Sequence, residues 1–146
     1  MLKTRALVAV IALPILLVVI LAGGWWFALL VFGALLLAGD EYTRLLRQGD
    51  LHPPEWLVLG LITLAMVSTW FENPDWRDPG IALLLIAGTF TVIWDMEHGR
   101  MRPTPGLALA VFGGIYLGWL GSYLLAVRML EDGAYLTIVL YGCVIV

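Results

Sequence analysis

Few residues in this chain carry side chains that could do chemistry, and the densest group lies between two apolar runs. Asp95, Glu97 and His98 fall within four residues of one another, and carboxylate and imidazole groups are ligands for divalent metal ions. A metal site would need further ligands at a suitable spacing, and the sequence holds no second set. We therefore expect these residues to form a solvated loop rather than a metal centre.

Two arginines follow this group directly. Arg100 and Arg102 could hold the phosphate of an anionic lipid headgroup, because cations next to a membrane attract such lipids. Membrane topology explains the same two positions, so headgroup contact is one of two alternatives. His52, which stands before Pro53 and Pro54, is typical of an exposed loop.

Sequence motifs of common enzymes are absent. The chain has no P-loop, no dinucleotide-binding glycine pattern, no G-x-S-x-G, no H-E-x-x-H and no C-x-x-C. Its long apolar runs contain no Asp, Glu, Lys, Arg or His, whereas proton- and ion-coupled transporters usually carry such residues within the membrane. The sequence therefore argues against an autonomous transporter and shows no evident acid–base machinery.

The apolar run that ends near residue 127 has two different faces. On a helix, Gly114, Gly118 and Gly121 fall within about 60° of one another, and small residues of this kind let another helix approach closely. The opposite face carries four aromatic residues: Phe112, Tyr116, Trp119 and Tyr123. The aromatic face either packs against a neighbouring helix or lines a lipid-accessible cavity, in which Tyr116 and Trp119 would need polar partners.

The elements that position these residues must be strongly apolar. The chain has 146 residues, of which 62% are hydrophobic and 13% charged, and its mean hydropathy is +0.96. A soluble domain is about half apolar and about a quarter charged, so we expect an all-α, multi-pass membrane protein. The net charge of −3 gives no reason to expect nucleic acid as a partner.

Five apolar runs approach the roughly 20 residues that a membrane span needs, and a sixth begins at Ala134. We expect five transmembrane helices and a truncated sixth, in a single transmembrane region that covers residues 1–146. The runs are Ala6–Leu21, Trp25–Gly39, Trp56–Phe71, Pro79–Trp94, Gly106–Val127 and Ala134–Val146.

The positions of the cationic residues predict the orientation. Alternate segments hold six of the eight Lys and Arg residues, namely Lys3, Arg5, Arg44, Arg47, Arg100 and Arg102. Cytoplasmic loops are enriched in Lys and Arg, so we expect a cytoplasmic N-terminus. Residues 40–47 should extend the second helix beyond the membrane, with Tyr42 facing the lipid surface.

Several stretches, in this order, resemble the N-terminal half of bacterial phosphatidate cytidylyltransferase, also called CDP-diacylglycerol synthase. The first is Leu2-Lys3-Thr4-Arg5 before a span that contains proline, and the second is Glu41-Tyr42-Thr43-Arg44-Leu45 after a helical hairpin. The third is the run Phe112–Leu120, of the type F-G-x-x-Y-x-G-x-L, and the last is the turn Glu131-Asp132-Gly133. The order of these stretches carries most of the resemblance.

The resemblance implies a transferase of phospholipid biosynthesis in the cell inner (plasma) membrane. Such an enzyme joins CTP to phosphatidic acid, gives CDP-diacylglycerol and pyrophosphate, uses Mg²⁺ and is a homodimer. Tyr116 and Trp119 would line the wall for the acyl chains. The catalytic signature of the family, which includes an Asp-Thr-Gly-Ala-Tyr type of segment, does not occur in residues 1–146. The resemblance therefore implies the front part of a longer enzyme, cut within its sixth helix and inactive alone.

Two other functions stay open at this point. The chain could be a small non-enzymatic membrane protein that associates with a partner through its glycine face. It could also be part of a transporter or of another lipid-modifying enzyme.

Overall fold

The computed structural model describes residues 17–72, 75–98 and 103–145. A helical segment, residues 17–22, precedes five longer helices, and the described residues include no strand. The helices are α2 (Gly24–Gln48), α3 (Glu55–Trp70), α4 (Arg77–Glu97), α5 (Pro103–Met129) and α6 (Gly133–Ile145). The predicted all-α class is confirmed.

Prolines and glycines set the helix boundaries. Pro54 precedes α3, Pro79 lies in the first turn of α4 and Pro103 opens α5. Proline suits a first turn because the N–H groups there have no partner within the helix. The segment 17–22 is separated from α2 by Gly23. Gly23 and Gly24, the first residue of α2, have φ angles of 61° and 53°, which strain residues other than glycine. These prolines and glycines thus lie at or next to helix starts.

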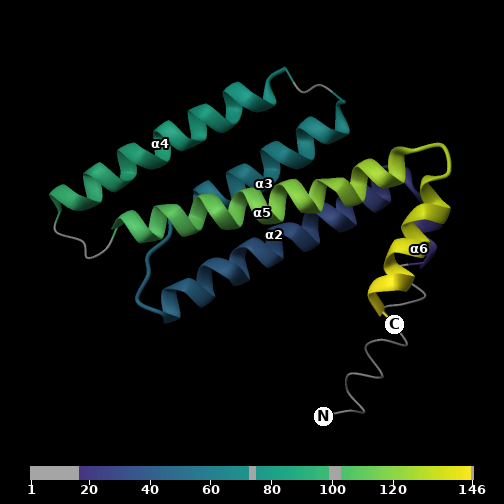
Figure 1. Cartoon of the computed structure of the whole chain (residues 1–146), viewed down its shortest axis with the longest axis horizontal. Coiled ribbons are helices and arrows are strands. Elements are labelled where there is room, and N and C mark those ends of the chain that lie inside the picture. Colours follow the sequence, from purple (N-terminus) through teal and green to yellow (C-terminus); the bar gives the residue numbers. More distant parts are fainter. Residues whose placement is uncertain (1–16, 73–74, 99–102, 146) are drawn as a thin grey trace, which may run out of the picture.

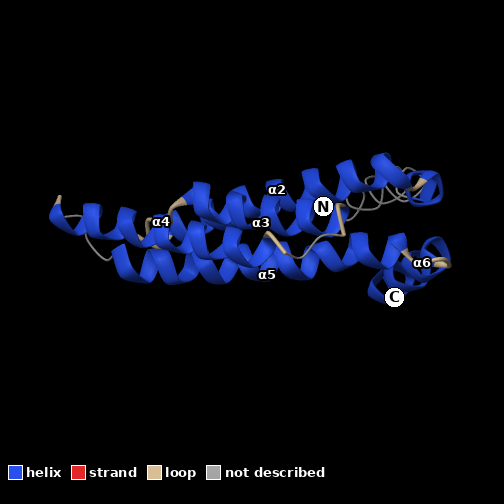
Figure 2. Ribbon diagram, turned by 90° about the horizontal axis from the view of Figure 1, so that it is seen from above, coloured by secondary structure: helices blue, strands red, loops and turns tan. Residues whose placement is uncertain are grey.

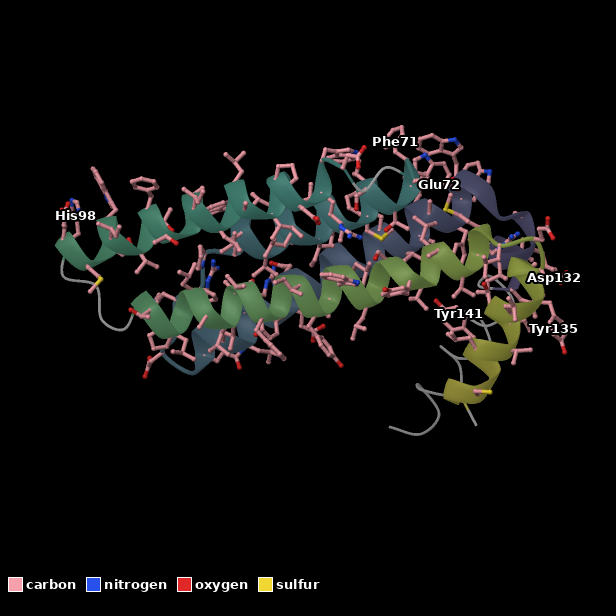
Figure 3. The ribbon with its side chains drawn as sticks, turned by 45° about the horizontal axis from the view of Figure 1, so that its top comes forward. Phe71, Glu72, His98, Asp132, Tyr135 and Tyr141 are labelled. Atoms are coloured by element: carbon pink, nitrogen blue, oxygen red, sulfur yellow. The ribbon has the colours of Figure 1, made fainter. Side chains whose placement is uncertain are left out.

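Helices α2 to α5 lie side by side as an antiparallel bundle (Figures 1 and 2). We call one end the Arg47 end; there α2 and α4 finish while α3 and α5 begin. The opposite end, where α5 finishes, is the Arg128 end. In Figure 3 the labelled residue His98 lies at the Arg47 end, and the labelled residues Glu72 and Asp132 lie at the Arg128 end.

Helix α3 is the centre of the bundle, because it packs against α2, α4 and α5. Its residues Leu57, Val58, Leu61 and Ile62 are almost fully buried, together with Ala110 of α5. Lipid tails are as apolar as leucine side chains, so no hydrophobic effect drives helices together inside a membrane. Helix association there depends on close packing and on interhelical hydrogen bonds. The bundle contains both.

One interhelical hydrogen bond corrects an expectation. The hydroxyl of Tyr42 donates to the backbone oxygen of Leu109 at 2.9 Å, and its ring lies against Gly113, where a Cβ would overlap it. Tyr42 therefore points into the α2–α5 contact and not toward the lipid surface. The prediction that Tyr42 faces lipid was wrong because helical periodicity does not show which neighbouring helix a given face contacts.

Three described helices are long and apolar enough to cross a membrane: Gly24–Gln48, Arg77–Glu97 and Thr104–Met129. They indicate a membrane protein. Helix α3, at 16 residues, and the apolar stretch Gly133–Cys143 are shorter than a usual span of roughly 17 to 25 residues. The first predicted span, Ala6–Leu21, lies mostly outside the described residues.

Helix α6 does not lie along the bundle (Figure 1). In Figure 1 it starts at the Arg128 end and runs across the axis of α5. The turn that redirects it is tight, because a Cβ on Gly133 would overlap the backbone oxygen of Arg128. At the same end, the Arg128 Nε–H donates to the backbone oxygen of Ile20 at 2.9 Å. This bond ties the segment 17–22 to the end of α5.

Candidate functional site

An open apolar groove runs along the outer face of α5, and we call it the α5 groove. It has a volume of about 640 Å³. The groove is lined by Ala108, Val111, Phe112, Ile115, Tyr116, Trp119, Leu120 and Tyr123. Both residues that were expected to line a lipid-accessible cavity, Tyr116 and Trp119, lie in it, with 54% and 44% of their surface exposed.

The aromatic residues of the α5 groove are held by one another. The rings of Phe112 and Tyr116 stack with their centroids 5.7 Å apart. The indole N–H of Trp119 donates to the hydroxyl of Tyr123 at 3.3 Å, so this N–H has a hydrogen-bond acceptor within the protein. The guanidinium of Arg77 lies 5.2 Å from the centre of the Trp119 ring. The groove therefore has a fixed aromatic floor with a cation beside one of its rings.

The opposite face of α5 is the glycine face. A Cβ on Gly114 would lie 2.9 Å from the Leu61 Cβ, and one on Gly118 would lie 3.0 Å from the Ile62 Cα. Gly121 faces Leu35 of α2. Neighbours within the same chain thus occupy this face, and an external helix could not pack on it.

A second hollow, the Arg47 groove, lies at the Arg47 end between α2, α3 and α4. Its volume is about 780 Å³. It is lined by Arg47, His52, Pro53, Pro54, Glu55, Trp56, Phe90, Thr91, Trp94 and Asp95. Within it, an Arg47 guanidinium N–H donates to Glu55 Oε2 at 2.8 Å. His52 is on the loop 51–54, as predicted.

The acidic and imidazole side chains near residue 95 are not on a loop. Asp95 and Glu97 belong to the last turn of α4, and His98 is its C-terminal cap. The His98 ring stacks on Trp94, with centroids 4.8 Å apart, and its Nδ1 is 2.8 Å from the Trp94 backbone oxygen. Among the described residues no group of three or more His, Cys, Asp or Glu is placed to hold a metal ion. Arg100 and Arg102 lie outside the described residues.

Sequence reasoning missed a third hollow, at the Arg128 end. This apolar cavity of about 290 Å³ is lined by residues of α2 and α3, with Leu125 of α5 and Phe71. Trp25 and Trp70 meet there with ring centroids 4.7 Å apart. The sequence could have indicated this hollow. Trp25 lies at the start of α2 and Trp70 at the end of α3, and these two ends are adjacent when the helices pack antiparallel.

Comparison with known proteins identifies the family. The family model described as "Cytidylyltransferase family" matches residues 3–146, which is nearly the whole chain. No curated protein and no solved structure matches it. The match covers the apolar bundle and both grooves, and the chain belongs to the cytidylyltransferase family.

Proposed function

We propose that the chain is the lipid-facing part of a phosphatidate cytidylyltransferase. The observation that carries the proposal is the family match over a chain that is itself an apolar helical bundle. A transferase that uses CTP and consists of membrane-spanning helices is suited to an acceptor that stays in the bilayer. A phosphate oxygen of phosphatidic acid would attack the α-phosphorus of CTP. The bond between the α- and β-phosphates would break, giving CDP-diacylglycerol and pyrophosphate.

The α5 groove would take the acyl chains of phosphatidic acid. Its lining is apolar, it opens outward, and its length along α5 runs parallel to the direction of lipid tails in a bilayer. The indole N–H of Trp119 donates to the hydroxyl of Tyr123, so this donor keeps a partner in an apolar surrounding. The glycine face supports the same assignment, because its contact with α3 removes the surface that a non-enzymatic association module would need.

The metal that the proposed reaction uses does not fit this part of the enzyme. Mg²⁺ offsets negative charge on the phosphates when it is bound and prefers carboxylate and water oxygens. No suitable cluster is present in the part of the chain that the structure describes. We therefore propose that Mg²⁺ and CTP bind to a catalytic part of the enzyme outside residues 1–146. From the family resemblance we also propose that the full-length enzyme is a homodimer.

The proposal places the protein in the inner membrane with the Arg47 end on the cytoplasmic side. Arg44 and Arg47 lie at that end, which agrees with the enrichment of cations in cytoplasmic loops. CTP is a cytoplasmic substrate, so the reaction should face the same side.

Sealed inverted and right-side-out vesicles would test activity and sidedness together. Vesicles that contain the product of the whole reading frame should form CDP-diacylglycerol from phosphatidic acid, external CTP and Mg²⁺ when they are inverted. Right-side-out vesicles should do so only after permeabilisation. Residues 1–146 alone should give no product. Absence of product from permeabilised full-length vesicles would refute the proposed reaction, and equal activity in both sealed preparations would refute the orientation.

A further inference from the structure

Trp119 stands between the α5 groove and a small polar hollow, which we call the α3–α4–α5 junction. The ring lines the α5 groove together with other residues of α5, and it also lines the junction, to which all three helices contribute. The polar lining residues of the junction are Ser68, Thr69, Arg77 and Ser122. No residue of α4 lines the α5 groove, so the contact of α4 with Trp119 is a route by which α4 can influence it.

Arg77, the first residue of α4, makes this contact. The carbon of its guanidinium lies 5.2 Å from the centroid of the Trp119 ring, within the roughly 6 Å over which a cation is attracted to an aromatic face. The indole N–H donates to the hydroxyl of Tyr123. The ring is therefore held at its edge from within α5 and at its face from α4.

The contact does not require an unpaired guanidinium. The Arg77 Nε–H donates to Asp78 Oδ1 at 3.5 Å, and the Asp78 side chain is 81% exposed, so this ion pair contributes little. A guanidinium can lie on a ring with its plane while the N–H groups at its edge donate hydrogen bonds. Ser68 and Ser122 donate to backbone oxygens of their own helices, which leaves the lone pairs of both hydroxyl oxygens as acceptors in the junction.

Helix stability and membrane topology both disfavour a cation at this position. The N-terminus of a helix carries partial positive charge, which repels a cation in the first turn. The Arg128 end is also the side that we assign away from the cytoplasm, where cations are fewer. The other cation described at this end, Arg128, has a specific partner in the backbone oxygen of Ile20. Arg77 has its own in the ring of Trp119.

We propose that Arg77 is a positioning residue for the binding of acyl chains. It fixes the Trp119 ring as part of the floor of the α5 groove, and it thereby couples the place of α4 to the shape of that groove. The inference rests on the proposed function of the α5 groove. Arg77 is not among the residues that line this groove, so its effect on the lipid passes through Trp119.

Fluorine NMR tests the hold of Arg77 on the ring without any enzyme activity. The purified chain is labelled with 5-fluorotryptophan in micelles, and the resonance of Trp119 is the one that disappears in Trp119→Phe. Arg77→Gln should move this resonance and leave those of the other six tryptophans in place. Arg77→Lys keeps a cation near the ring and should move it less.

Arg44→Gln is the matched control. Arg44 pairs with Asp40 on the surface of α2, and its replacement should leave the Trp119 resonance unchanged. A Trp119 resonance that stays in place in Arg77→Gln overturns the proposal. So does one that moves together with all the others in both Arg77 variants, because the effect would then not be local to the ring.

A double-mutant cycle in the full-length enzyme tests the consequence for the lipid. Arg77→Gln should raise KM for phosphatidic acid by about threefold with little change in kcat, and it should raise KM no further when Trp119 is already alanine. An equal rise in both backgrounds overturns the proposal. Absence of product from the unchanged full-length enzyme refutes the proposed function and the role in acyl-chain binding with it, whereas the fluorine measurement judges the hold on Trp119 independently.

Discussion

Gly118→Leu is expected to separate α3 from α5 and to unfold the bundle under conditions in which the unchanged protein is stable. A Cβ at this position would lie 3.0 Å from the Ile62 Cα and 3.1 Å from the Leu61 backbone oxygen. Both are backbone atoms that a rotamer change cannot move. Overpacking a core usually costs about 1 to 3 kcal/mol, and a leucine against backbone should reach the upper end of this range.

The measurement is unfolding in mixed micelles with increasing SDS, followed by circular dichroism. Gly33→Leu is the control, since a Cβ on Gly33 meets no atom within 4 Å; this variant should unfold like the unchanged protein. If Gly118→Leu and Gly33→Leu unfold at the same SDS concentration, the close approach of α3 and α5 is wrong.

Replacing both Tyr116 and Trp119 with alanine is expected to weaken the use of phosphatidic acid by the full-length enzyme. The two rings form the floor of the α5 groove, which the proposed function assigns to the acyl chains and not to the reacting phosphates. Their loss removes contacts that substrate and transition state share, so KM for phosphatidic acid should rise by about tenfold while kcat changes little.

The assay varies the surface concentration of phosphatidic acid in mixed micelles at saturating CTP. Trp26→Ala serves as the control, because Trp26 is exposed and lines neither groove; its KM should stay unchanged. A fall in kcat without a change in KM would place these rings in the chemical step and would contradict a role in holding the acyl chains.

Much of this fold can be predicted from the sequence because apolar runs and breakers are local signals. Pro54, Pro79 and Pro103 stand where helices begin, and Gly23 and Gly24 mark the junction at which α2 begins. The extension of α2 to Gln48 and the division of α5 into a glycine face and an aromatic face also follow from local spacing. These features depend on residues within one helix.

Features that depend on several helices could not be predicted in the same way. Tyr42 reads as a lipid-facing side chain until Gly113 of α5 is placed against it. The last turn of α4 reads as a loop because Asp95, Glu97 and His98 are polar, although Trp94 and His98 stack across that turn. The Arg47 groove combines residues of α2, α3 and α4, and no local pattern brings them together.

The direction of α6 is a further example. Its composition is that of a membrane span, but the tight turn at Gly133 and the contact of Arg128 with Ile20 fix how the chain leaves α5. Hydropathy reports whether a helix prefers an apolar environment. It carries no information on the angle between that helix and its neighbours.

Photo-crosslinking tests most directly the central claim that this chain holds a lipid substrate along α5. The full-length protein in vesicles is irradiated with phosphatidic acid that carries a diazirine in one acyl chain, and labelled peptides are located by mass spectrometry. The label should fall on residues 108–123, and excess unlabelled phosphatidic acid should displace it while phosphatidylglycerol does not. Label spread over α4 and α5 alike, undiminished by unlabelled phosphatidic acid, would contradict the claim.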